Sequence, residues 1–175
     1  MRLFVAIEFP DEIKDALLTG AKAAENCFVR AVFSRRENYH LTLAFLGETP
    51  PSRVKDVIAA MDRCGFAPFS LTIGSAGRFR RDGGDTLWRK AEAPTALYEI
   101  QSKLTAELIS RGFCLEERSF KPHITVAREA VLRENVRFSD ISFGAPLTFT
   151  ATGMTLMRSD RINGKLTYTP VCRKK

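Results

Sequence analysis

The chain has 175 residues, of which 45% are hydrophobic and 27% are charged, and its 27 Lys and Arg against 20 Asp and Glu give a net charge of +7. This length and apolar content fit one folded domain and exclude disorder, collagen and coiled coil as descriptions of the whole chain. No apolar stretch is long enough to span a membrane, and the run Leu3–Ile7 ends at Glu8, too early for the core of a signal peptide. We therefore expect a single soluble domain over residues 1–175, located in the cytoplasm, with no membrane partner.

The cysteines and the net charge limit the possible partners. Cys27, Cys64, Cys114 and Cys172 are widely spaced and include no C-x-x-C pair, so neither a zinc site nor a disulfide scaffold is indicated. A basic chain favours polyanions and approaches nucleic acid faster at low salt. The charge alone does not identify a partner.

Hydrophobic patterning in the N-terminal part predicts the order strand, helix, strand, strand, helix. Asp11 is a candidate N-cap for the first helix, which Gly20 weakens slightly, and the second helix starts at Pro51 and Ser52. The predicted strands and helices are Arg2–Phe9, a helix from Asp11 to about Ala24, Phe28–Phe33, His40–Leu46 and a helix from Ser52 to about Gly65.

The C-terminal part contains the same kinds of element. Thr95 is a candidate N-cap for a third helix that ends at Gly112, and the charged, glycine-containing segment Arg78–Asp85 is typical of an exposed loop. Residues Ser159–Gly164 are predicted to form the turn of a hairpin, and Arg128–Pro146 gives no clear signal. The predicted strands are Phe69–Ile73, Thr86–Ala91, Phe113–Leu115, His123–Ala127, Leu147–Met157 and Lys165–Val171.

The order of elements repeats at low resolution. A helix followed by a histidine-bearing strand occurs twice, with His40 and His123 at the starts of the two strands. This repeat predicts two similar α+β lobes, each formed by about half of the chain and facing the other. No Pro, Gly or Ser-rich linker separates them, so one domain is expected.

The chain has only two histidines, and each is followed two positions later by threonine. The motifs are His40-Leu41-Thr42-Leu43 and His123-Ile124-Thr125-Val126, and coincidence is a poor explanation because threonine makes up only 14 of the 175 residues. In a strand, residues i and i+2 share one face. Each segment therefore offers an imidazole and a hydroxyl to one surface and apolar residues to the core.

Two imidazoles and two hydroxyls in one cleft suit acid/base chemistry without a metal. Near neutral pH one imidazole can act as a base while the other, protonated, acts as an acid. Thr42 and Thr125 can donate to phosphate oxygens, and Arg128 can clamp a phosphate if it turns toward the cleft. A phosphate ester is thus the natural substrate of the predicted site.

Other residues give weaker signals. Trp88 and Tyr39 could stack on bases, although aromatic residues in strands more often belong to the core or its rim. Arg78, Arg80 and Arg81 could contact a polyanion or be solvated surface charges.

The chain resembles bacterial RNA 2′,3′-cyclic phosphodiesterases of the 2′-5′ RNA ligase family, which belong to the two-histidine phosphoesterase superfamily. The resemblance covers nearly the whole chain. It rests on the paired HxTx motifs within Asn38–Glu48 and Lys121–Arg128, and more weakly on Arg2–Ile7, Trp88 and the ending Tyr168-Thr169-Pro170. One departure is Trp88-Arg89-Lys90, where family members often have an apolar residue and glycine after the tryptophan. This departure bears on strand packing or RNA contacts rather than on the histidines.

The resemblance implies a bilobal α+β fold with two pseudo-symmetric lobes, antiparallel sheets lining a central cleft and helices outside. It implies hydrolysis of RNA 2′,3′-cyclic phosphate ends to a terminal 2′-phosphate, an RNA-processing activity. His40 would be the proton donor and His123 the proton acceptor, with Thr42, Thr125 and Arg128 on the phosphate. No cofactor or metal is expected, and a monomer is expected.

Three alternatives stay open at this point. The same histidines could join a cyclic phosphate end to a 5′-hydroxyl in a 2′-5′ linkage. The substrate could instead be a small cyclic nucleotide or an ADP-ribose derivative. The chain could also be a non-catalytic RNA-binding module, which would bind with strong salt dependence and ignore the chemistry of the RNA end.

Overall fold

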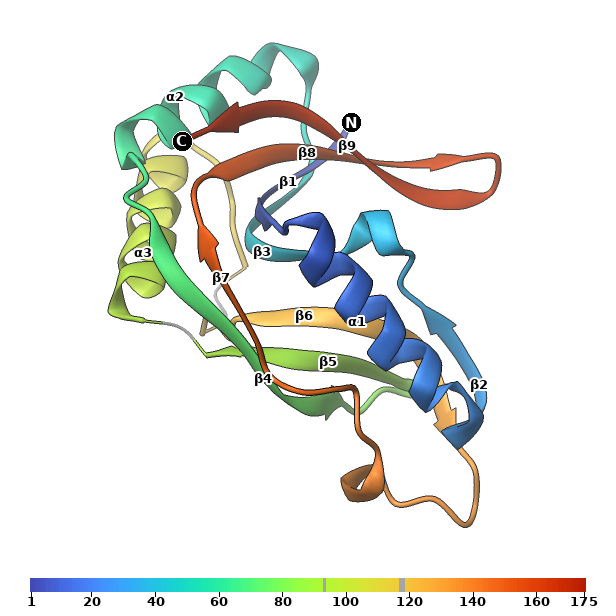
Figure 1. The fold of residues 1–175 in the computed structure, drawn as a ribbon. Helices are drawn as coiled ribbons and strands as arrows, with labels where there is room; N and C mark the ends of the chain where they lie inside the picture. The colour runs from blue at the N-terminus through green and yellow to red at the C-terminus, as the bar shows by residue number, and fades with distance from the viewer. Residues whose placement is uncertain (93, 117–118) are drawn as a thin grey trace.

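The computed structural model describes residues 1–92, 94–116 and 119–175, and their strands form two antiparallel sheets (Figure 1). The four-stranded sheet has the order β3-β1-β8-β9. Its strands are β1 (Arg2–Glu8), β3 (His40–Glu48), β8 (Met154–Ile162) and β9 (Lys165–Lys174). Among the described residues, no helix is long and apolar enough to cross a membrane.

The five-stranded sheet has the order β2-β6-β5-β4-β7. Its strands are β2 (Phe28–Phe33), β4 (Phe69–Phe79), β5 (Asp85–Glu92), β6 (His123–Leu132) and β7 (Leu147–Ala151). The prediction of two α+β lobes is confirmed, but their assignment to successive halves of the chain is wrong. Strand β2 pairs with β6, and the C-terminal β8–β9 hairpin completes the sheet that holds β1 and β3.

Three α-helices are described: α1 (Asp11–Ala24), α2 (Val54–Cys64) and α3 (Thr95–Ser110). Their starts differ from the sequence prediction, because neither Asp11 nor Thr95 acts as a side-chain cap. Each of these two residues is instead the first helical residue after a proline, whose fixed φ prepares the helix entry. The predicted start of α2 at Ser52 is a short 3-10 helix over Pro51–Arg53.

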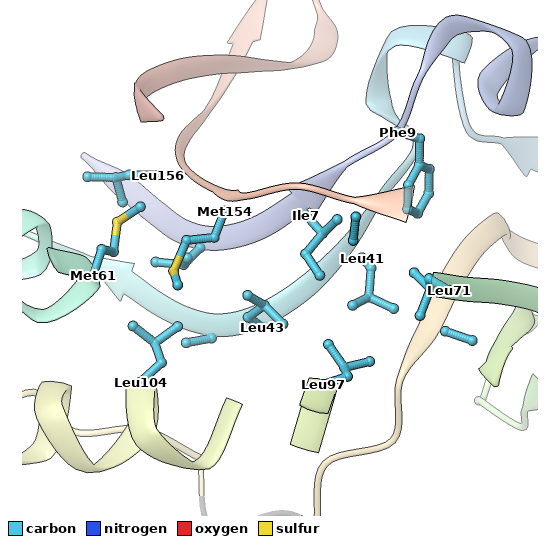
Figure 2. Packing of buried hydrophobic residues seen from close by; sticks show 14 of the residues in the cluster. Ile7, Phe9, Leu41, Leu43, Met61, Leu71, Leu97, Leu104, Met154 and Leu156 are labelled. Atoms are coloured by element: carbon cyan, nitrogen blue, oxygen red, sulfur yellow. The ribbon is translucent and has the colours of Figure 1, made fainter. Parts of the chain in front are cut away.

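The largest core lies where both sheets meet the helices. Figure 2 shows Ile7, Leu41 and Leu43 of the four-stranded sheet packed near Leu71 of β4 and Leu97 of α3. These side chains occupy alternate positions of their strands, which leaves the intervening residues on the opposite face. On β3, where burial alternates, the side opposite the core carries partly exposed polar residues.

Two predicted strands near the C-terminal part are wrong. Phe113–Leu115 is not a strand: α3 ends at Ser110, and the Phe113 backbone N–H donates to the carbonyl of Leu108 to close the helix. Its apolar residues pack against the core instead. The run Leu147–Met157 is not one strand, since it divides before Met154 into β7 and β8, which belong to different sheets.

Three boundaries also move. The charged loop is shorter than predicted, because β4 continues to Phe79 and β5 begins at Asp85. The hairpin turn is confined to Asn163 and Gly164, both with positive φ, as expected of a two-residue turn. The segment without a clear signal contains the end of β6 and a short 3-10 helix over Phe138–Asp140.

Arg89 is buried in the core side of β5, with 2% of its surface exposed. The pairing of β4 with β5 is irregular between Ile73 and Ala76, and such a bulge leaves carbonyl groups unpaired. The Arg89 guanidinium donates to the carbonyls of Ile73 and Gly74 at this bulge, and to those of Phe143 and Ala145 in the connection to β7. The departure noted at Arg89 therefore serves strand packing.

Candidate active site

His40 lies at the first position of β3, with its ring held on both sides. Its Nδ1 lies 2.7 Å from the carbonyl oxygen of Asn38, and its Nε2 lies 3.0 Å from Oγ1 of Thr42. Leu41 and Leu43 are buried, so His40 and Thr42 share the opposite face, as the alternation predicts. Because a carbonyl only accepts hydrogen bonds, the neutral ring carries its proton on Nδ1 and leaves Nε2 as the basic atom.

His123 repeats this arrangement at the first position of β6. Its Nδ1 lies 2.6 Å from the carbonyl oxygen of Lys121, again two residues before the histidine. Ile124 and Val126 are buried, and His123 and Thr125 are half-exposed on the other face. In both neutral imidazoles, Nε2 is therefore the nitrogen that can accept a proton.

The strand pairing shows that the two motifs are structurally equivalent. His40 and Thr42 pair with Glu8 and Ala6 of β1. His123 and Thr125 pair in the same way with Lys90 and Trp88 of β5. The first motif lies on β3, which pairs with β1, the strand before α1. The second motif lies on β6, which pairs with β5, the strand before α3.

Strands β3 and β6 contact each other although they belong to different sheets. The two histidines are close enough for the charge of His123 to lower the pKa of His40. The fold therefore brings both motifs into one site.

Arg128 reaches the site because of a β-bulge. In a regular strand, a residue five positions after His123 would lie on the opposite face. The pairing of β5 and β6 shifts between Leu87 and Trp88, and consecutive Val126 and Ala127 are both buried, which restores Arg128 to the face of His123. Its side chain is exposed, and its charge lowers the pKa of both histidines.

Aromatic rings surround each imidazole. The ring of His40 lies 4.9 Å from Phe4 and 5.0 Å from Tyr168, measured between centroids. His123 lies 5.2 Å from Phe79 and 6.2 Å from Trp88. Sequence reasoning did not assign Phe4, Phe79 or Tyr168 to the site, since only the sheet pairing brings these strands beside the histidines.

Tyr39 and Trp88, the two aromatic candidates for base stacking, lie in different environments. Tyr39 is 2% exposed and belongs to the core, so it cannot stack on a base. Trp88 is half-buried beside His123, and its ring covers Gly77 of β4, where a Cβ would collide with it. The ring of Trp88 thus forms part of the surface on which His123 lies. Of the arginines predicted for the loop, Arg78 lies in β4 and pairs with Asp85 of β5, whereas Arg80 and Arg81 are exposed.

The surroundings of both imidazoles favour their neutral forms in the free protein. Burial lowers the pKa of His40 to about 4, assisted by the charges of Arg128 and His123 and opposed by the Asn38 carbonyl. Burial also lowers the pKa of His123, with Arg128 acting in the same direction. Burial raises the pKa of Tyr168, and the charges of Arg128 and Arg2 oppose this. Arg128 is therefore electrostatically coupled to both histidines and to Tyr168.

No group of three or more His, Cys, Asp or Glu residues that could hold a metal ion occurs within the part of the chain that is described. Two strand-borne imidazoles with the same anchoring, two hydroxyls and a nearby guanidinium form the donor set that two-histidine acid/base chemistry on a phosphate ester requires.

The model of the 2′-5′ RNA ligase superfamily matches residues 9–163, and the chain belongs to this family. An RNA 2′,3′-cyclic phosphodiesterase of Escherichia coli is 31% identical over 176 residues, which cover 98% of this chain and 94% of that protein. A protein of the same name from Geobacillus stearothermophilus is 33% identical over 129 residues, covering 72% of this chain but only 41% of that protein. The crystal structure of E. coli LigT complexed with 3′-AMP superposes with a TM-score of 0.84 at 29% identity, covering 98% of this chain and 95% of that one.

Proposed function

We propose that this protein hydrolyses the 2′,3′-cyclic phosphate end of RNA to a terminal 2′-phosphate, with His40 and His123 as the acid/base pair. The observation that carries the proposal is the duplicated anchoring of the two rings, each bonded through Nδ1 to the carbonyl two residues earlier. The names of the relatives support the substrate class, and the 3′-AMP held by the LigT structure supports a nucleotide ligand.

The reaction needs one base and one acid on opposite sides of the phosphorus. Nε2 of His123 removes a proton from water as the water oxygen attacks phosphorus. The bond from phosphorus to the 3′ oxygen breaks, and protonated His40 gives its proton to that oxygen. The products are a 3′-hydroxyl and a 2′-phosphate, so atoms and charges balance. This choice of acid and base follows the family resemblance.

Because the pKa of His40 is low in the free protein, the bound substrate itself must favour protonation of this histidine. In the free protein, His40 is neutral at pH 7 because its site is buried and faces positive charge. A bound cyclic phosphate carries a negative charge, which favours the protonated imidazole. Thr42, Thr125 and Arg128 donate to the phosphoryl oxygens as negative charge develops there. Substrate binding and protonation of the acid are therefore coupled.

We also infer a monomer in the cytoplasm that acts in RNA processing. Both imidazoles come from one chain, so the site needs no second copy. All four cysteines are free, which is the state that a reducing compartment maintains.

The test is hydrolysis of a short RNA ending in 2′,3′-cyclic phosphate, with EDTA present, by the wild type and by His40→Ala and His123→Ala. Each variant should lose about 10²–10⁴-fold in rate, the contribution of a positioned acid or base. Lys55→Ala, at an exposed position of α2, serves as a control and should retain full activity.

The outcomes separate the alternatives. A 2′-phosphate product that both histidine variants fail to form supports the proposal. Near-normal rates in either variant would refute it. Binding of the RNA without turnover would favour a small cyclic nucleotide or a binding module, and joining to an added 5′-hydroxyl RNA would favour ligation.

A further inference from the structure

An open groove of about 500 Å³ lies on the side of the five-stranded sheet that carries His123 and Thr125. It is lined by side chains of β4, β5 and the start of α3: Ser70, Thr72, Lys90, Glu92, Pro94 and Tyr98. The groove adjoins the active site through Lys90, which pairs directly with His123 across the sheet. The groove is shallow and open to solvent, so it would contact a ligand on one side only.

Lys90 contributes an exposed ammonium to the groove, which Glu92 of the same strand also lines. The equivalent position beside His40 is Glu8, whose carboxylate accepts hydrogen bonds from Thr155 and Arg173. Lys90 is exposed and forms no ion pair with any described residue. The two halves of the site are therefore similar at the histidines but different at the position paired with each histidine, which is an ion-paired carboxylate beside His40 and an exposed ammonium beside His123.

The other groove residues suit a nucleobase. Tyr98 is 45% exposed, and Phe120 holds its ring edge-on at 5.9 Å, so one aromatic surface is available and fixed. Aromatic rings stack on bases of single-stranded RNA, and hydroxyls and carboxylates bond to base edges. Ser70 supplies a hydroxyl, and Glu92 supplies a carboxylate that can accept from base N–H groups. The hydroxyl of Thr72 is hydrogen-bonded to that of Thr148 at 2.9 Å.

We propose that this groove binds the nucleotide that precedes the cyclic phosphate end, which makes an RNA strand a better substrate than a cyclic mononucleotide. This inference rests on the proposed function. Paired residues of neighbouring strands lie about 5 Å apart, so Lys90 stands where the phosphodiester on the 5′ side of the terminal nucleotide leaves the active site. Lys90 contacts that phosphodiester, and the base beyond it lies against Tyr98.

The experiment compares kcat/KM for a 2′,3′-cyclic mononucleotide and for a dinucleotide with the same cyclic end. The wild type should prefer the dinucleotide. Tyr98→Ala and Lys90→Ala should each lower the ratio of the two kcat/KM values roughly tenfold, the size expected for loss of one stacked base or one phosphate contact. Lys90→Ala should also reduce the slope of the logarithm of the dinucleotide binding constant against the logarithm of salt concentration by about 1. Lys55→Ala, on the exposed side of α2, should leave the ratio as in the wild type.

Equal kcat/KM for both substrates, or a ratio that neither groove variant changes, would overturn the inference and leave the proposed function intact. If the wild type hydrolyses neither substrate, the proposed function fails instead. In that case, the binding of a dinucleotide that ends in a 2′-phosphate, measured by fluorescence anisotropy, tests whether the groove binds the preceding nucleotide. Weaker binding by both groove variants supports it, and unchanged dissociation constants refute it.

Discussion

Arg89 provides a sharp test of how this fold is held together, because it is a buried cation without an ion pair among the described residues. The perturbation is Arg89→Met, which keeps much of the side-chain length and removes the guanidinium. Four carbonyl groups lose their donor, two at the bulge of β4 and two at Phe143 and Ala145. The substitution should loosen the connection between β6 and β7 from the sheet.

The magnitude follows from two opposing effects. Each buried carbonyl left without a donor costs about 1–3 kcal/mol. Replacing a buried charge by an apolar group recovers part of this, because the charge no longer has to leave water. With four acceptors affected, the lost hydrogen bonds exceed the recovered desolvation, and we expect a net loss of about 3 kcal/mol in the free energy of unfolding.

Urea unfolding followed by circular dichroism measures this loss. For a slope of about 2 kcal/mol per molar urea, the midpoint should fall by about 1.5 M. The matched control is Lys90→Met at the next position of the same strand, whose exposed side chain should leave the midpoint near that of the wild type. The reasoning would be refuted if Arg89→Met lowered the urea midpoint by less than about 0.5 M. It would also be refuted if Lys90→Met lowered the midpoint as much as Arg89→Met.

Three further predictions concern the core and the site. Gly20→Ala should destabilise the protein by about 1–3 kcal/mol in urea unfolding, although alanine normally favours a helix, because a Cβ there would collide with the Phe143 carbonyl; a gain in stability would contradict the packing. The kcat/KM optimum should lie below pH 6.5, since both histidine pKa values are lowered, and Arg128→Ala should move it to higher pH by removing a positive charge; a shift to lower pH would reverse the assigned sign. Tyr168→Phe should lower kcat/KM roughly fivefold by removing the polar group that lies within the field of Arg128 and on the ring that packs on His40, while the urea midpoint stays constant; unchanged kinetics would exclude a positioning role.

Features that depend on neighbouring residues could be predicted from the sequence. Strand geometry requires residues i and i+2 to share a face, so His40 with Thr42 and His123 with Thr125 were predictable before any pairing was known. Most helices and strands were predictable for the same reason, since their apolar periodicity is local.

Which strands pair, and where their pairing is irregular, depends on long-range contacts that could not be predicted from local patterns. The sheet membership of β2 and the division between β7 and β8 depend on contacts between residues far apart in the sequence. Arg128 faces the histidines because a bulge in β6 shifts the alternation, which no local pattern reveals. Arg89 and Lys90 are adjacent in the sequence, yet one is buried under a bulge and the other faces the groove beside His123. Their opposite environments follow from the core packed on one side of β5 and the solvent on the other.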